Sequence, residues 1–136
     1  MKKSKAKTVF LIGIIITFSI AGCTKEKEKA NSKFVGTYIG NANCDGSITN
    51  ESIPIEASSN DASGIKMFLN SAHTLNASVN GNSISIPVQN FPSGNENYRY
   101  SGLGTLNGNA LSLTISVLYS SVDPDYPYTC VFTLSK

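Results

Sequence analysis

Acid–base and nucleophilic chemistry have few candidate residues in this chain. Its 136 residues include one histidine, His73, in the segment Asn-Ser-Ala-His-Thr, which is typical of a polar turn. Hydrolysis through Ser, Thr or Cys needs a base beside the nucleophile and a third group that orients the base. No Gly-x-Ser-x-Gly motif presents such a serine. We interpret His73 as a turn residue, and an enzyme stays an option only if folding brings it beside a carboxylate and a serine in a pocket.

Paired carboxylates are the other candidates for catalysis or metal binding. A glycosidase needs two of them about 5–9.5 Å apart, but Glu51 and Glu56 are an odd number of positions apart and face opposite sides of a regular strand. Asp123 and Asp125 could share a calcium ion, yet calcium needs about six to eight oxygens and no calcium-loop spacing is present. The sequence predicts no enzyme, no metal site and no cofactor.

The first 22 residues have the three-part layout of an export signal. Four lysines lie within the first seven positions, an apolar run of twelve residues follows at 9–20, and Ala21 and Gly22 are small. A membrane-spanning helix needs about 20 apolar residues, so we predict that residues 1–22 are a signal peptide. Without the four lysines, acidic residues outnumber basic ones by two, and the charge distribution excludes a nucleic-acid partner.

The end of the apolar run carries a short motif. Ile20-Ala21-Gly22-Cys23 resembles the lipobox of bacterial lipoproteins. The resemblance implies that cleavage makes Cys23 the first residue of the mature chain, and that acyl chains on Cys23 hold the protein on a membrane, because two or more chains anchor firmly. The alternative is ordinary secretion, which would leave Cys23 as an unpaired thiol.

The following segment, 23–32, is rich in alternating charge and is predicted to be a tether. Nine residues of flexible chain span about 15–18 Å. Thr24 after the cysteine, where inner-membrane retention often uses Asp, is similar to an outer-membrane address. We expect a lipid-anchored protein of the bacterial cell envelope, on the outer membrane, with the periplasmic and the surface leaflet both open.

Cys44 and Cys130 are predicted to form a disulfide, because an exported protein with two remaining cysteines most simply pairs them. A zinc site would need about four ligands, and His73 is the only imidazole. Cys44 follows the first predicted strand and Cys130 lies near the start of the last. The bond therefore requires the two ends of the sheet to meet.

Residues 33–136 form the predicted folded domain, an all-β antiparallel up-and-down meander. Apolar and polar residues alternate in short runs between clusters of Asn, Gly, Asp, Ser and Pro. Eight strands are expected, at Phe34–Gly40, Ile48–Ala57, Gly64–Asn70, Thr74–Val79, Ser83–Gln89, Tyr98–Leu106, Ala110–Tyr119 and Tyr128–Ser135. We predict a closed or partly open barrel, with Pro54 and Pro87 favouring the partly open form. A two-sheet β-sandwich is the alternative.

Two repeated Asn-Gly pairs, Asn80-Gly81 and Asn107-Gly108, predict tight hairpins with these residues as the loops. The predicted cross-strand partners are Gly104 with Leu111, Gly102 with Leu113, Tyr100 with Ile115, Tyr98 with Val117, Ala77 with Ile84 and Leu75 with Ile86. Each hairpin then has one coherent apolar face, and we expect these side chains to fill most of the interior.

The start of the domain carries a second resemblance. Gly36-Thr37-Tyr38 opens the first predicted strand and is similar to the Gly-x-Trp start of lipocalin and avidin-like barrels, with Tyr38 in the place of Trp and Lys136 as the nearest cation. The resemblance implies a small barrel over nearly all of residues 33–136.

Five of the six tyrosines gather at the end of the predicted barrel opposite the Asn107-Gly108 turn, and the predicted loop 90–97 would form a rim there. The candidate binding residues are Tyr98, Tyr100, Tyr119, Tyr126, Tyr128 and Phe91. Tyrosine suits a binding mouth, but it is also an ordinary strand residue that packs under loops.

These patterns indicate a non-enzymatic lipid-anchored lipoprotein that binds a small apolar ligand or an envelope protein at the tyrosine-rich end. The alternative is an inhibitor or assembly factor that docks onto another envelope protein.

Overall fold

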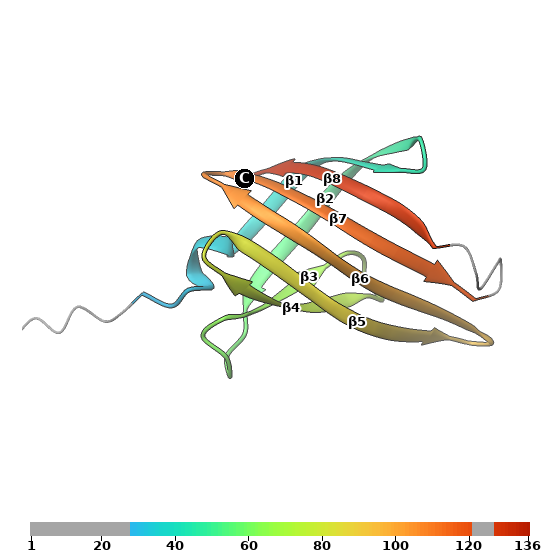
Figure 1. Cartoon of the computed structure of the whole chain (residues 1–136), viewed down its shortest axis with the longest axis horizontal. Helices are drawn as coiled ribbons and strands as arrows, with labels where there is room; N and C mark the ends of the chain where they lie inside the picture. Colours follow the sequence, from blue (N-terminus) through green and yellow to red (C-terminus); the bar gives the residue numbers. More distant parts are fainter. Residues whose placement is uncertain (1–27, 121–126) are drawn as a thin grey trace, which may run out of the picture.

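Eight antiparallel strands close into one barrel in the computed structural model, which describes residues 28–120 and 127–136. Each strand pairs with the next along the chain, and the last pairs with the first (Figure 1). The elements are a 3₁₀ turn η1 (Ser32–Phe34) and strands β1 (Gly36–Cys44), β2 (Ser47–Ala57), β3 (Gly64–Phe68), β4 (Thr74–Asn80), β5 (Ser83–Ser93), β6 (Glu96–Asn107), β7 (Ala110–Tyr119) and β8 (Tyr128–Ser135). The predicted meander is confirmed and the sandwich is excluded. No helix in the described ranges has the length and hydrophobicity to cross a membrane.

The interior is built by alternation along the strands, since every second side chain of a barrel strand points inward. The inward side chains expected from the hairpins are all buried: Leu75, Ala77, Ile84, Ile86, Leu111, Leu113 and Ile115. Each fully buried Leu or Ile contributes about 1.5–3 kcal/mol relative to an exposed one. The hydrophobic pattern therefore supplies both the fold and its core.

Both predicted hairpins form, but each register differs from the predicted one by two residues. Asn107 pairs with Ala110, so the loop is Gly108-Asn109, and Asn80 pairs with Ser83 in the same way. Each loop begins with a glycine at positive φ (57° and 59°), which is where a type II′ turn places glycine. The prediction that asparagine and glycine are the two loop residues was wrong, because asparagine completes the strand.

The two-residue shift in register changes the cross-strand partners, but each side chain stays on the predicted face of its strand. The observed pairs are Gly104 with Leu113, Gly102 with Ile115, Tyr100 with Val117, Tyr98 with Tyr119 and Val79 with Ile84. A slip of one residue would turn every side chain to the other face, whereas a slip of two leaves it in place. Small still lies opposite large, since a β-carbon on Gly104 would collide with the Leu113 side chain.

Half of the strand limits differ from the predicted ones, by one to four residues. Phe34 belongs to η1 and not to β1, because its amide donates to the carbonyl of Asn31 in a tight turn. β1 instead continues to Cys44, and β3 ends two residues early at Phe68. The segment 90–97 is largely strand, with a two-residue turn that contains Gly94 at φ 62°.

Pro92 does not interrupt that hairpin, in which it pairs with Asn97, next to the turn-flanking pair Ser93 and Glu96. In a two-residue hairpin the flanking pair is hydrogen-bonded and the next pair is not. The nitrogen of Pro92 therefore faces away from β6, where the absence of an N–H costs no hydrogen bond.

The barrel closes, but the ladders between its strands are short at Pro54 and at Pro87. The β2–β3 ladder has three pairs, from Ile55 with Met67 to Ala57 with Ile65, and stops beside Pro54. The N-terminal half of β2 pairs only with β1, and Figure 1 shows the β1–β2 hairpin rising away from β3 at this end.

Beside Pro87 the side chain of Gln89 takes the place of backbone hydrogen bonds between β4 and β5. β5 has a bulge between Ile86 and Gln89, and the β4–β5 register covers only three pairs near the turn. The Gln89 side chain accepts from the Asn76 amide at 2.8 Å and donates to the Asn76 carbonyl at 2.8 Å. These two bonds are those that a strand residue would make, so one amide side chain continues the wall past Pro87.

The N-terminal segment closes one end of the barrel. Phe34 in η1 is fully buried, as is Asn31, whose Nδ2 donates to the carbonyls of Asp61 (3.0 Å) and Gly64 (2.8 Å). At the same end, Nζ of Lys136 lies 5.1 Å from the centroid of the Tyr38 ring. This ammonium also donates to the carbonyls of residues 33 and 35. Lys136 thus ties the C-terminus to the closed end.

The predicted disulfide is confirmed and joins the first strand to the last. Cys44 and Cys130 are direct partners in the β1–β8 ladder, with 4.1 Å between their Cα atoms. The bond spans 86 positions of sequence. Closure of so long a loop removes much conformational freedom from the unfolded chain.

Replacement of both cysteines, Cys44→Ala with Cys130→Ala, is expected to lower the free energy of unfolding by about 4 kcal/mol, because the unfolded chain regains the entropy of a long open loop. Urea unfolding of the full chain, followed by far-UV circular dichroism, measures the change. An unchanged unfolding midpoint would show that the β1–β8 ladder closes the barrel without help from the bond.

Candidate functional site at the open end of the barrel

A cavity of about 340 Å³ opens at the end of the barrel opposite η1. It is lined by Ala42, Cys44, Glu51, Leu69, Asn70, Tyr100, Ile115, Val117, Tyr128, Cys130 and Phe132. These residues come from β1, β2, β6, β7 and β8 and from the β3–β4 connection. The disulfide forms part of the wall. The interior is filled at the closed end and hollow here, so the expectation of a mostly filled barrel holds for one end only.

Size explains why the cavity lies at this end. Near η1 the inward side chains of β1 and β2 are large, with Tyr38, Ile53 and Ile55 all buried. Towards the mouth the inward positions of β1 are occupied by Gly40, Ala42 and the disulfide-bonded Cys44. Side chains this small cannot fill a barrel of eight strands, which is just wide enough for full-sized ones.

An aromatic cluster flanks the cavity, as the sequence predicted. The Tyr98 and Tyr119 rings stack with their centroids 4.6 Å apart, and Tyr100 lies 6.3 Å from Tyr98. Phe91 meets Tyr100 edge-on at 5.6 Å. Rings at these separations stabilise one another beyond their buried area. The cluster is therefore a rigid part of the mouth.

His73 lies at the centre of this cluster, which the sequence analysis did not foresee. Its ring is 5.0 Å from Phe91, 5.1 Å from Tyr98 and 5.3 Å from Tyr100, and its Nδ1 lies 2.8 Å from the Tyr100 hydroxyl. The sequence did carry a signal: His73 lies two positions before Leu75, which is buried on β4, and residues two apart on an extended chain point to the same side. The described partners of the imidazole are the three aromatic rings and the hydroxyl of one of them, Tyr100.

The predicted binding residues divide into three groups. Tyr100 and Tyr128 line the cavity. The aromatic rings of Phe91, Tyr98 and Tyr119 form the cluster beside it. Tyr126 lies outside the described residues, as does the lipidation candidate Cys23.

Glu51 is the lining residue whose role the sequence analysis missed. It lies on the inward face of β2, two positions from the buried Ile53, and Glu56 lies on the opposite face, as the odd spacing predicts. Its carboxylate accepts a hydrogen bond of 2.7 Å from the Thr49 hydroxyl. No Lys or Arg in the described part of the chain pairs with it. The cavity therefore has an apolar wall with one carboxylate near its rim.

The two tyrosines that line the cavity are held in their neutral form. Burial raises the pKa of the Tyr100 hydroxyl to about 12, and the nearby Tyr128 and Tyr98 add to the rise. Burial also raises the pKa of Tyr128, with contributions from Tyr98 and from the carboxylate of Asp45. At neutral pH both phenols carry no charge and can donate hydrogen bonds.

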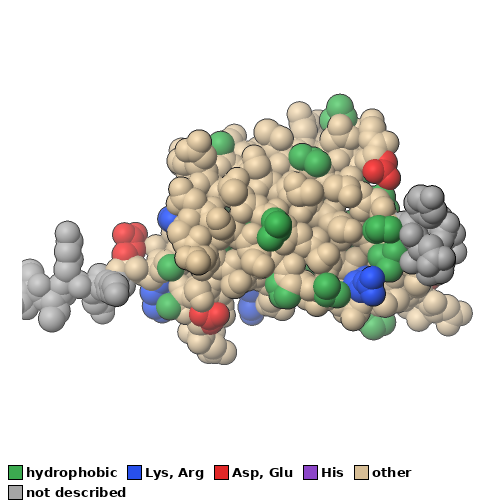
Figure 2. All heavy atoms as spheres, in the orientation of Figure 1, with side chains coloured by type: hydrophobic (Ala, Val, Ile, Leu, Met, Phe, Trp, Pro, Cys, Tyr) green, Lys and Arg blue, Asp and Glu red, His purple; other side chains and the backbone are tan. Residues whose placement is uncertain are grey.

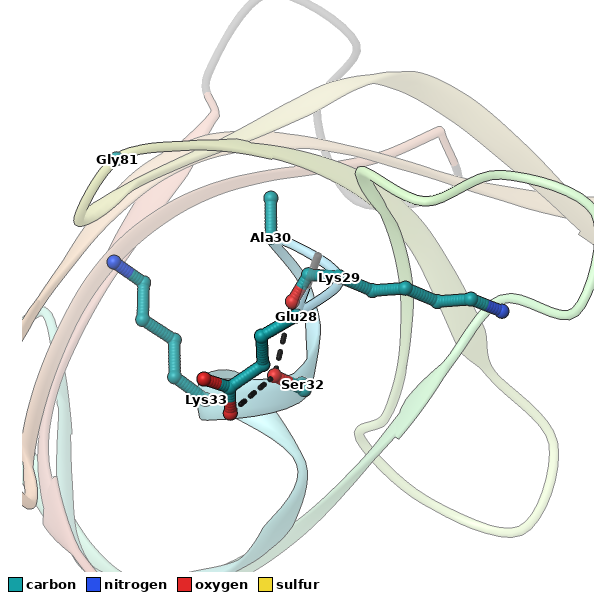
Figure 3. A pocket seen from close by; sticks show the side chains of 6 residues that line it. All are labelled: Glu28, Lys29, Ala30, Ser32, Lys33 and Gly81. Carbon is teal, nitrogen blue, oxygen red and sulfur yellow. Dashed lines mark hydrogen bonds between the residues drawn. The ribbon is translucent and has the colours of Figure 1, made fainter. Parts of the chain in front are cut away.

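Two of the hollows outside the barrel interior lie near the main cavity and near the closed end. One, of about 430 Å³, lies where β2 leaves β3 and shares Leu69 and Asn70 with the main cavity. The other, of about 220 Å³, lies at the closed end, where Lys29 and Lys33 extend in opposite directions from the segment that contains η1 (Figure 3). The closed-end hollow is bordered by exposed polar chains and has no aromatic or buried wall.

Comparisons of the chain with family models, curated proteins and solved structures found no match. Within residues 28–120 and 127–136, no three His, Cys, Asp or Glu side chains come together to hold a metal ion. The site is therefore defined by its own geometry: an apolar cavity with neutral phenols, an amide and one carboxylate.

The raised pKa of Tyr100 predicts alkaline destabilisation. An unfolded tyrosine ionises near pH 10 and the folded Tyr100 near pH 12, so between these values the unfolded chain has lost a proton that the folded chain keeps. The free energy of unfolding should fall as the pH rises from about 10 to 12. In Tyr100→Phe this fall should be shallower, as measured by urea midpoints at several pH values. Equal slopes in the two proteins would contradict the assignment.

Proposed function

We propose that this protein is a non-enzymatic, lipid-anchored β-barrel lipoprotein of the bacterial cell envelope that binds a small apolar ligand in the open-end cavity. The observation that carries the proposal is the cavity of about 340 Å³ at the end opposite η1, where the lining contributed by residues 28–120 and 127–136 is mostly apolar. Known small-molecule sites are concave and mostly apolar, of about 300–1,000 Å³, with a few polar groups that orient the ligand.

The exposed apolar surface favours a small ligand over docking of another protein. Leu103, Thr114 and Val131 form one cross-strand row on the outside, so the two exposed hydrophobic side chains are separated by a polar one. Single hydrophobic side chains stand among uncharged polar surface on the face in Figure 2. Scattered apolar residues are normal for soluble surfaces, whereas protein-binding sites present contiguous patches.

The proposed anchor agrees with the position of the closed end. The described chain begins at Glu28 and reaches η1 four residues later, so a lipid on Cys23 would lie near the plugged end of the barrel. The open end would then face away from the membrane. Thr24, the residue after the proposed lipidation site, supports an anchor in the outer membrane, in either the periplasmic or the surface leaflet.

The contacts of His73 support a binding protein over a hydrolase. Catalysis would require the imidazole to accept a proton from a serine while a carboxylate orients it. Its described partners are aromatic rings and the Tyr100 hydroxyl. These contacts suit a structural ring at the rim of a binding site.

A cavity-filling substitution tests ligand binding. Ala42→Phe places a ring in the cavity and is expected to weaken binding of 4-phenylbutanol at least tenfold, as measured by isothermal titration calorimetry on the full chain in detergent. Asn41→Phe, the matched control, adds the same ring to the outer face of β1 and should bind as wild type. Equal affinity in both variants, or no binding to the wild type, would overturn the proposal.

Lipidation at Cys23 is tested with globomycin, which blocks the peptidase that cleaves lipoprotein signals. Treated cells should accumulate a precursor longer than the mature chain by 22 residues, detected by immunoblot and mass spectrometry. Cys23→Ala should remain unprocessed without the drug. Normal processing in the presence of globomycin would refute lipidation and support ordinary secretion.

A further inference from the structure

We infer that the open-end cavity selects an organic cation, a molecule with an apolar body and one protonated amine, and that Glu51 is the residue that binds the amine. This inference rests on the proposed function, because it specifies the ligand of the same cavity. It follows from three features of the site: the direction of Glu51, the absence of a partner cation in the described structure, and the uncharged aromatic wall around it.

Strand geometry directs Glu51 inward. Alternation on β2 places Glu51 on the same face as Ile53 and Ile55, which are buried in the core. Its cross-strand partner on β1 is Gly40, where the backbone of β8 packs so closely that a β-carbon would collide with the Thr133 carbonyl. Glu51 is therefore the carboxylate that the wall presents to the cavity.

The carboxylate lacks a neutralising partner. Within residues 28–120 and 127–136 its contact is the Thr49 hydroxyl, which is neutral. Lys33 and Lys136 are engaged at the closed end, and Arg99 lies on the outer face of β6. A carboxylate at the edge of an apolar cavity, where water is partly excluded, attracts a cation more strongly than it would on an open surface.

The rest of the lining adds to the attraction for a cation. Tyr100 and Tyr128 are neutral phenols, and aromatic faces attract ammonium groups. The carboxylate of Asp45 is close enough to Tyr128 to raise its pKa, so a second negative charge acts on the mouth. Asn70 supplies an amide that can accept a hydrogen bond. A ligand with a carboxylate or phosphate would meet only repulsion from Glu51.

Three probes that share one apolar body test the inference: 4-phenylbutylamine, 4-phenylbutanol and 4-phenylbutyrate. Calorimetric titration of the full chain in detergent, with detergent-only blanks, gives the three affinities. We expect the amine to bind about tenfold more tightly than the alcohol, and the carboxylate more weakly than the alcohol. The preference for the amine should decrease as the salt concentration rises.

Two matched substitutions locate the charge. Glu51→Gln keeps the size of the side chain and should bring the amine and alcohol affinities to within about twofold of each other. Glu56→Gln removes the same charge from the outer face of the same strand and should keep the preference of the wild type. Far-UV circular dichroism and the urea unfolding midpoint report whether Glu51→Gln is folded.

The outcomes separate the inference from the proposed function. Equal binding of amine and alcohol by the wild type, or a preference that persists in Glu51→Gln, would overturn the role of Glu51 and leave ligand binding intact. Failure of all three probes to bind would overturn the ligand-binding function itself, and the inference with it.

Discussion

The ladder between β1 and β8 is the contact on which the remaining structure depends. It turns an open meander into a closed wall, and Cys44 and Cys130 make that closure covalent at the end where the cavity opens. A closed wall leaves no free edge between the first and last strands. The same bond that stabilises the fold therefore also forms a rigid wall of the proposed binding site.

The two ends of the barrel have different roles because their inward residues differ in size. Large side chains and η1 fill the closed end, while Ala42 and the disulfide leave space at the mouth. The wall is weakest where proline removes a backbone donor, and at one of these places the amide of Gln89 bonds to the Asn76 backbone in its stead. The ladders that join β6, β7, β8 and β1 are long and regular, so most of the cavity wall lies on the continuous side of the barrel.

Much of the fold followed from local rules. Alternation predicted the meander and the buried face, and the cysteine positions required the ends to meet. Local rules failed where a choice depended on tertiary contacts. Asn107 was predicted to be in a turn, but Gly108 alone supplies the positive φ, so Asn107 completes a strand pair. Phe34 was predicted to begin β1, but burial in the closed end holds it in a turn.

The site was predicted in part. Tyrosine enrichment indicated the end of the barrel at which the cavity lies, because strand direction alone determines which residues share an end. His73 and Glu51 were missed, since each was weighed as a catalytic group and dismissed. The inward direction of Glu51 is visible only when its number is compared with those of the buried residues on β2, and His73, which precedes β4, is placed by its ring contacts.

The Asn31 contacts have a mechanical consequence. The segment that leads from the proposed anchor also forms the floor of the barrel, held by the side-chain amide of Asn31 and by the ring of Phe34. Tension applied through the N-terminus would act first on these contacts. It would pull the segment with Asn31 and Phe34 out of the barrel before any strand separates. The cavity lies at the other end of the barrel, so such a pull would reach its lining only after the contacts of Asn31 and Phe34 had broken.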